Sequence, residues 1–261
     1  MEVIIQPTEQ DAVKLTAAIL GDALRNNPEM VFGLATGATM EAVYAELARM
    51  CREEALDFSS AKSFNLDEYI GLPAEDKNSY RYYMDYHFFD KINIKKANTH
   101  LPNGMTEDIA GEGRRYEAAI EAVGGIDLQL LGIGQDGHIG FNEPLSSLGS
   151  RTRDKSLTPE TYKQNSIYFE PPESMPRRAF TMGVGTILDA RRIVMLVTGE
   201  RKADIIAKAV EGPVTSMITA SAIQFHPNAV VIVDEAAASN LQGQAYYRWS
   251  FENEPRWEAF R

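Results

Sequence analysis

The segment of the chain best suited to chemistry is a glycine-rich stretch at 134–144, which reads Gly-Gln-Asp-Gly-His-Ile-Gly-Phe-Asn-Glu-Pro. It places Asp136, His138 and Glu143 close together, directly after an apolar run at 126–133 that is typical of a buried strand. A carboxylate beside an imidazole fixes the tautomer of the ring and raises its basicity. The pattern therefore predicts a proton-transferring histidine with two carboxylate partners.

Two other interpretations of this segment stay open. Asp136, His138 and Glu143 could hold a metal ion, as in a metal-dependent hydrolase, although their spacing is not a recognised ligand pattern. The segment could also be only a tight turn with a hydrogen-bonded histidine. Its glycines favour a functional loop, because glycine lets the backbone adopt unusual conformations close to a ligand; they are Gly132, Gly134, Gly137 and Gly140.

A second candidate is the acidic pair Asp67-Glu68, which follows what reads as the end of a strand in Phe-Asn-Leu-Asp-Glu-Tyr (64–69). Such a pair in a loop is usually solvated surface. A carboxylate held over a substrate, however, would serve as the base for a carbon-bound proton. Asp67 is the candidate for that role.

Two further stretches could bind a small phosphate. One is a turn between an apolar run at 31–35 and a helical pattern; it consists of Thr36, Gly37, Ala38 and Thr39. Small residues at a helix N-terminus let backbone amides approach an anion, although Thr39 could instead be an ordinary N-cap. The other is Lys202, at the start of a helix expected over roughly 200–211, which could supply a point charge. Neither is a nucleotide-binding fingerprint.

Apolar runs and helical patterns alternate along most of the chain. Strands are expected at 31–35, 126–133, 193–198 and 229–233, with amphipathic helices between them. Near-continuous apolar strands separated by helices predict an α/β fold, an open, mostly parallel sheet with helices on both faces. We expect a single domain over residues 1–261, with ligands at the carboxyl ends of the strands.

Two aromatic segments have no assigned chemistry. Six aromatic side chains between Tyr80 and Phe89 favour a helix packed in the core over one that stacks on a ligand. Trp249 and Trp257 both lie in the C-terminal stretch from 244 to 261, where a docked tail or a subunit contact would explain them.

Composition limits the partners. The 261 residues include 26 basic and 37 acidic side chains, a net charge of −11, which argues against a broad nucleic-acid footprint. The single cysteine, Cys51, excludes an internal disulfide and fits a reducing compartment. The sequence has no apolar run long enough to predict a membrane span, and Met1–Pro7 does not have the pattern of a signal peptide. We therefore expect a cytoplasmic protein that acts on a small ligand.

Taken together, these stretches resemble the glucosamine-6-phosphate deaminase family (glucosamine/galactosamine-6-phosphate isomerases). The similar segments occur in the family's order at 34–39, 64–72, 134–144, 150–153 and 198–203. The resemblance implies a Rossmann-like fold of the NagB/RpiA/CoA-transferase-like type. It also implies deaminating isomerisation of glucosamine 6-phosphate to fructose 6-phosphate and ammonia, in amino-sugar catabolism and N-acetylglucosamine utilisation.

The resemblance also implies a role for each matched residue. Asp67 would move a proton from C2 to C1 of the open-chain sugar, and His138 would open the pyranose ring. Asp136 and Glu143 would orient His138 and tune its charge. The turn at 36–39 and Lys202 would bind the phosphate, and no metal or organic cofactor is expected.

A lid around 145–170 and a regulatory site are implied more weakly. Some bacterial relatives are hexamers activated by N-acetylglucosamine 6-phosphate, and the residues here that could form that site are Ser146, Arg153 and Lys155. The family's C-terminal aromatic has only Trp249 as a match. Galactosamine 6-phosphate is an alternative substrate, and a non-catalytic sugar-phosphate sensor is disfavoured because Asp67 and His138 are both present.

One departure from the family pattern bears on phosphate binding. The family's lid usually carries an arginine on the substrate phosphate, two residues after an asparagine, whereas this chain has Ile167 there, after Asn165. Losing a charge-assisted contact costs roughly 1.5–3 kcal/mol. Lys163 lies nearby and could substitute, without bidentate geometry.

Restoring the arginine should therefore strengthen substrate binding. We expect Ile167→Arg to lower the Michaelis constant for the sugar phosphate by roughly tenfold, because it returns a guanidinium to the lid. Steady-state kinetics measures this, and an unchanged constant would contradict the interpretation.

Overall fold

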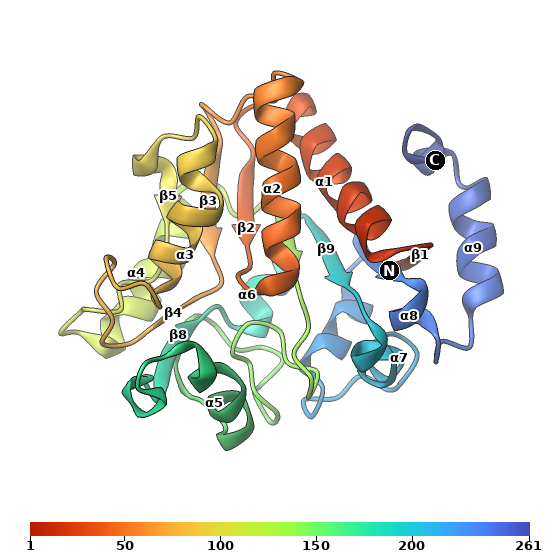
Figure 1. Cartoon of the computed structure of the whole chain (residues 1–261). Helices are drawn as coiled ribbons and strands as arrows, with labels where there is room; N and C mark the ends of the chain where they lie inside the picture. Colours follow the sequence, from red (N-terminus) through yellow and green to blue (C-terminus); the bar gives the residue numbers. More distant parts are fainter.

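Seven parallel strands form the central sheet of the computed structural model, which describes residues 1–261 (Figure 1). Their bounds are β1 (Glu2–Gln6), β2 (Val31–Leu34), β3 (Lys62–Asn65), β5 (Thr99–His100), β6 (Leu128–Leu131), β9 (Arg192–Val197) and β10 (Ala229–Asp234). They lie in the order β1-β10-β9-β6-β2-β3-β5, and every pairing is parallel. The four apolar runs expected as strands are β2, β6, β9 and β10, so the predicted parallel α/β sheet is confirmed.

The helices that connect these strands cover both faces of the sheet. Figure 1 shows three of them in front of it, and they are α1 (Glu9–Asn26), α2 (Ala38–Glu53) and α3 (Tyr80–His87). After β5 the chain moves back across the sheet in the opposite direction, from β6 to β9 and β10. Right-handed crossovers therefore put the later helices on the opposite face. Those helices are α4 (Ile109–Ala122), α6 (Val184–Leu188) and α7 (Ala203–Val210). Thr8 caps the N-terminus of α1, since its hydroxyl accepts the Asp11 N–H.

A small antiparallel sheet, which the sequence patterns did not predict, stands beside the large one. It consists of β4 (Asp67–Tyr69), β8 (Arg178–Thr181) and β7 (Arg153–Ser156), in the order β4-β8-β7. Thr181 on the central strand pairs with Asp67 on one side and with Arg153 on the other. Helix α5 (Pro159–Asn165) and the short 3₁₀ turns 166–168 and 172–174 follow β7.

The large sheet has a topological switch point between β2 and β6. The chain leaves β2 toward β3 and leaves β6 in the opposite direction, toward β9, although β2 and β6 are neighbours. Connections that diverge from adjacent strands open a crevice at their carboxyl ends, where ligands of α/β sheets bind. The four chemically interesting stretches follow β9, β6, β2 and β3, which are consecutive neighbours.

The C-terminal stretch is a docked tail in part. After α8 (Glu235–Ala238), helix α9 (Gln244–Asn253) lies beside β1 (Figure 1). Trp257 is 1% exposed, and its indole N–H donates to Glu2 over 2.8 Å, whereas Trp249 is 58% exposed. No helix in the structure has the length and apolar character needed to cross a membrane.

Candidate functional site

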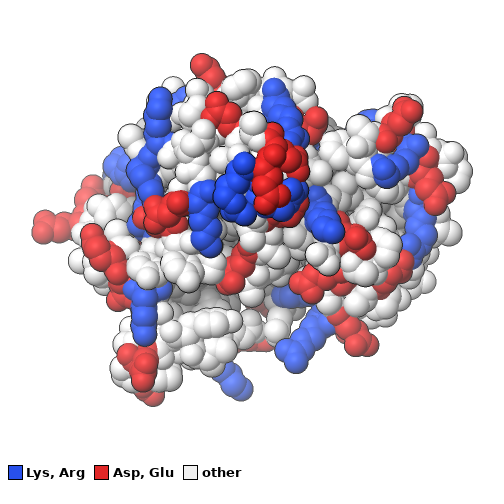
Figure 2. Space-filling view, turned by 45° about the horizontal axis from the view of Figure 1, so that its top comes forward, with Lys and Arg blue, Asp and Glu red and all other residues white.

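A cleft of about 610 Å³ opens at the carboxyl ends of β2, β3, β6 and β9. The residues predicted to act on a ligand all line it: Thr36, Gly37, Ala38, Thr39, Asp67, His138 and Lys202. Asp136 and Glu143 contact His138 without lining the cleft, and the candidate regulatory residues Ser146, Arg153 and Lys155 lie outside it. Figure 2 shows the molecule hollowed above its lower lobe, with acidic and basic side chains interspersed on the face in view.

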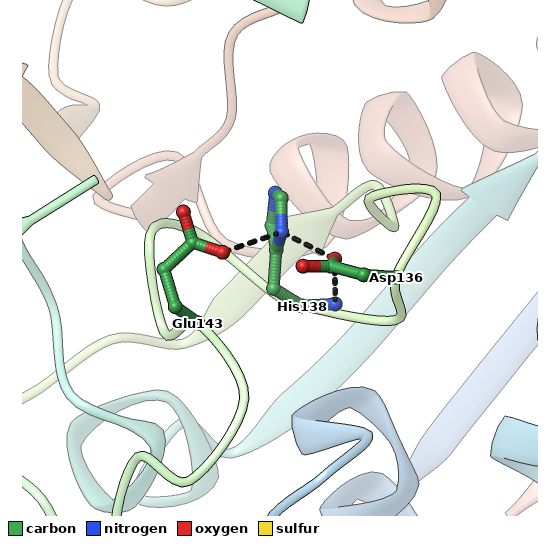
Figure 3. A group of neighbouring side chains, drawn as sticks. All are labelled: Asp136, His138 and Glu143. Atoms are coloured by element: carbon green, nitrogen blue, oxygen red, sulfur yellow. Dashed lines mark hydrogen bonds and ion pairs between the residues drawn. The ribbon is translucent and has the colours of Figure 1, made fainter. Parts of the chain in front are cut away.

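His138 is held between two carboxylates on the loop after β6 (Figure 3). Its Nδ1 lies 2.6 Å from Asp136 Oδ1 and 3.4 Å from Glu143 Oε2, as ion-pair contacts. The Asp136 carboxylate also accepts the backbone N–H of His138 over 3.1 Å. Because both carboxylates face Nδ1, the other ring nitrogen, Nε2, remains for a ligand.

These contacts decide the charge of the ring. Burial by itself would lower the pKa of His138, but the negative partners Asp136 and Glu143 outweigh it and raise that pKa to about 9. Burial would raise the pKa of Asp136, yet its hydrogen bond and ion pair with His138 hold it below the usual value. The partly buried pair is therefore an imidazolium and a carboxylate at neutral pH, and the ring can donate a proton.

A glycine makes room for this ring. A Cβ atom at Gly134 would lie 2.4–2.6 Å from three atoms of the His138 imidazole, closer than side chains pack. The Gly134 N–H donates to the His138 carbonyl over 2.9 Å, which closes the loop on itself. Glycine at 134 therefore reflects the packing of the imidazole against the backbone.

The loop is fastened to the small sheet that carries Asp67. The Phe141 N–H donates to the Thr181 hydroxyl over 3.0 Å, and the Asn142 side chain donates to the Met182 carbonyl over 2.8 Å. Thr181 is the strand partner of Asp67. The imidazole and the acidic residue are thus held relative to each other by β8.

Asp67 is a buried carboxyl group, 6% exposed, in β4 and not in a solvated loop. Burial is the main cause that raises its pKa, to about 8; the neighbouring charge of Glu68 adds to the effect and that of His138 opposes it. A carboxylate with a pKa near the operating pH is a stronger base than an ordinary aspartate. Its environment therefore suits proton abstraction.

Glu68, next to it, has a structural task. Its carboxylate accepts three backbone N–H groups, from Tyr69, Tyr80 and Arg81, over 2.8–2.9 Å. Two of these belong to the first turn of α3, so Glu68 satisfies the helix N-terminus. Burial raises the pKa of Glu68 to about 7, and the three hydrogen bonds limit that rise.

The turn 36–39 and Lys202, which the sequence predicts to bind a phosphate, also line the cleft. Helix α2 begins at Ala38 after Gly37, whose φ of 118° suits glycine alone, and no side chain caps it. Thr39 is therefore not the N-cap, and the interpretation of this turn as an ordinary cap is wrong. Lys202 lies on the 3₁₀ turn 200–202, and its Nζ donates to the Ile133 carbonyl over 2.7 Å. Burial lowers its pKa.

Helix α5 and the turn after it form one wall of the cleft. Asn165 donates to the Tyr69 hydroxyl over 3.1 Å, and Phe169 packs edge-on against the Tyr69 ring. Ile167 is 72% exposed and does not line the cleft; Lys163 does not line it either.

Sequence patterns missed several residues of this lining, including Tyr69, Lys77, Gln164, Asn165 and Tyr168. Tyr69 and Asn165 lie in stretches that the sequence analysis names without assigning these two residues a role, and Lys77, Gln164 and Tyr168 lie in no recognisable pattern. The aromatic segment has mixed roles: Phe88 and Phe89 are buried as expected, while Tyr80 and Tyr83 line the cleft.

The histidine and the two carboxylates that contact it could also, by their chemistry, hold a cation. Asp136, His138 and Glu143 offer one imidazole nitrogen and two carboxylate oxygens within 4.8 Å of one another. An ion there would compete with the proton for Nδ1, the atom that both carboxylates face. Treatment with a chelator therefore distinguishes a metal-binding cluster from a proton-transferring one.

The chain is similar to known proteins along nearly its whole length. The family profile described as glucosamine-6-phosphate isomerases/6-phosphogluconolactonase matches residues 6–232. The glucosamine-6-phosphate deaminase of Hahella chejuensis is 49% identical over 249 residues, 95% of each chain. That of Pseudarthrobacter chlorophenolicus is 48% identical over 258 residues, 99% of each chain. The structure of a monomeric glucosamine-6-phosphate deaminase of the NagB superfamily superimposes with a TM-score of 0.90 at 41% identity, covering 92% of this chain and 100% of the other.

The charge state of His138 is testable directly. We expect the imidazole to titrate at about pH 9 in the wild type and at a clearly lower pH in Asp136→Asn. The neutral amide removes one of the two negative charges that raise the pKa of His138 against the lowering effect of burial. Nuclear magnetic resonance of the ring protons measures both values. His100, which contacts neither carboxylate, serves as the internal control, and a His138 titration unmoved by the substitution would contradict the assigned ion pair.

Proposed function

The chain belongs to the family of glucosamine-6-phosphate isomerases and 6-phosphogluconolactonases, and from this premise we propose that it converts glucosamine 6-phosphate to fructose 6-phosphate and ammonia. The observation that carries the proposal is one cleft with a buried carboxyl group at Asp67 and an ion-paired imidazole at His138. The anion-binding turn at 36–39 lies in the same cleft. Lactone hydrolysis would give no role to a carbon-proton base at Asp67.

Ring opening is the first task. The imidazolium of His138 donates a proton to the ring oxygen of the pyranose while the bond between that oxygen and C1 breaks. The C1 hydroxyl gives up its proton to water, so that the open-chain aldehyde forms. Asp136 and Glu143 hold the ring at Nδ1, which leaves Nε2 to carry the transferred proton. The two carboxylates also stabilise the charged ring before the transfer, which raises the pKa of His138 above 7.

Isomerisation is the task of Asp67. Its ionised carboxylate takes the proton from C2 of the open-chain sugar and returns it at C1, which converts the amino aldehyde into a ketose imine. Water then hydrolyses the imine and releases ammonia. A positioned acid or base contributes roughly 10²–10⁴-fold to such a step, and neither step needs a cofactor.

The phosphate end of the substrate is assigned to the turn 36–39 and Lys202. Uncapped amides at the start of α2 and the positive end of the helix dipole favour a phosphate oxygen. Lys202 adds a point charge from the 3₁₀ turn that follows β9.

We also propose one domain over 1–261, with 145–170 as a lid on the cleft. Helix α5 supports this, because Thr161, Gln164 and Asn165 line the cleft opposite the turn 36–39. The lid rests on a separate apolar cluster that includes Tyr69, Phe141 and Phe169. A lid held by its own cluster can move without disturbing the main core.

A regulatory site for N-acetylglucosamine 6-phosphate at Ser146, Arg153 and Lys155 is the finer part of the proposal. Arg153 donates to the Asn142 side chain over 2.9 Å, and the Ser146 N–H donates to the Glu143 carbonyl over 3.0 Å, so both contact the catalytic loop. Within one chain, helix α9, which carries Trp249, lies beside β1, on the side of the molecule away from β8 (Figure 1). Assembly into an oligomer, a hexamer in some relatives, would therefore be needed to bring it there.

Ammonia release tests the central proposal. We expect wild-type protein to release ammonia from glucosamine 6-phosphate, and Asp67→Asn to lose roughly 10²–10⁴-fold in turnover with its thermal melting no lower, because a neutral amide replaces a buried acid. The assay is repeated with galactosamine 6-phosphate and with added N-acetylglucosamine 6-phosphate.

Its controls separate the alternatives. Prior treatment with a chelator should leave the rate unchanged, whereas a metal-dependent hydrolase would lose activity. No ammonia from either sugar would overturn the proposal and favour a sensor.

The pH dependence of kcat/KM follows from the two shifted groups. Turnover needs Asp67 ionised and His138 protonated, so the rate should rise with pH through about 8 and fall above about 9. In Asp136→Asn the alkaline limb should move to lower pH, and the acid limb should move to higher pH, because the charge of His138 that lowers the pKa of Asp67 is lost earlier. A rate profile measured across this range checks both, and a single limb would refute the paired assignment.

A further inference from the structure

We propose that Lys77 binds the phosphate of the substrate and supplies the second cation of the site, in place of the arginine that the lid lacks. The inference rests on the proposed function and extends it to a residue outside the similar stretches of sequence. It makes phosphate affinity depend on the loop before α3 and not on the lid.

The charge of the cleft calls for such a residue. Among the residues that line it, Lys77 and Lys202 are the only lysines and no arginine is present, while the acidic residues Glu41 and Asp67 also line it. The charge of the His138 imidazole is already paired with Asp136 and Glu143. The Lys202 amine already donates to the Ile133 carbonyl. A phosphate dianion among carboxylates needs more than one cation to offset its repulsion and desolvation.

The loop that carries Lys77 is fixed next to the anion-binding turn. Lys77 lies three residues before α3, whose Tyr83 hydroxyl donates to the Gly37 carbonyl over 2.8 Å. Glu68 holds the first amides of the same helix, and Ser79 caps it by accepting the Tyr82 N–H over 3.0 Å. The start of α3, and with it the loop end, is therefore anchored to the turn 36–39.

Lys77 is also free to act on a ligand. It forms no ion pair with any carboxylate of the chain, whereas Lys96 on the same side of the sheet is paired with both Asp85 and Asp90. Its side chain is exposed at the cleft, so it can turn toward a bound phosphate. An ammonium on a flexible stem suits this use as a point charge.

The lid offers no competing cation. Ile167 carries no charge and is outside the cleft lining, and Lys163, the nearest basic residue of α5, is exposed and also outside it. Lys163 forms no ion pair either, so it differs from Lys77 mainly in facing away from the cleft lining. This makes Lys163 a matched control.

The test compares Lys77→Gln with Lys163→Gln in the full chain. Two quantities are measured: the Michaelis constant for glucosamine 6-phosphate and the inhibition constant of inorganic phosphate. We expect Lys77→Gln to raise both by roughly 3- to 10-fold, with a smaller change in kcat, because an exposed cation contributes ground-state binding. Lys163→Gln should leave both within twofold of wild type, and Lys77→Arg should restore most of the loss.

The outcomes separate the two levels of the proposal. If wild-type protein releases ammonia and Lys77→Gln leaves both constants unchanged, the inference fails while the function stands. If Lys77→Gln and Lys163→Gln raise the constants equally, the effect is one of net charge, and the inference also fails. If wild-type protein releases no ammonia, the function fails, and calorimetric titration with inorganic phosphate still decides whether Lys77 binds it.

Discussion

The arrangement of the site depends on one partly buried ion pair, between the His138 imidazole and the Asp136 carboxylate, which lie 2.6 Å apart. Burial alone would discharge both groups, since each loses hydration; together they stay ionised. This keeps a proton on the ring at neutral pH and opposes the rise in the pKa of Asp67, which burial and Glu68 raise. Acid and base are thus set by the same small group of buried charges, one poised to donate a proton and the other to accept one.

The carboxylates that keep His138 charged also create the main electrostatic difficulty of the protein. A chain with a net charge of −11 has Asp67 in the lining of a cleft that we propose holds a phosphate, with Asp136 and Glu143 next to it. Burial and pairing separate part of this charge from a ligand: Asp136 and Glu143 contact His138 and do not line the cleft, whereas the uncapped start of α2 and Lys202 do line it. Local geometry, and not overall charge, decides whether the anion binds.

The switch point between β2 and β6 provides that separation. Loops from four neighbouring strands converge there, each contributing a different chemical group, and β8 fastens the histidine loop to the strand of Asp67. Parallel strands present their carboxyl ends at one edge, so groups far apart in sequence meet without long connections. The small antiparallel sheet then links Asp67 to Arg153, since Thr181 pairs with both.

The sequence by itself determined the parallel sheet, because buried parallel strands are continuous apolar runs, and it determined which stretches hold chemistry, because glycine-rich turns after strands are distinctive. It did not determine the small sheet, whose strands are short and carry polar or charged side chains such as Arg153, Asp154 and Lys155. Only the tertiary structure decided that Thr39 lies inside its helix and that Ile167 is outside the cleft. Lys77 was likewise beyond sequence reasoning: an exposed lysine has no distinguishing pattern, and its place at the cleft comes from the packing of α3 against the turn 36–39.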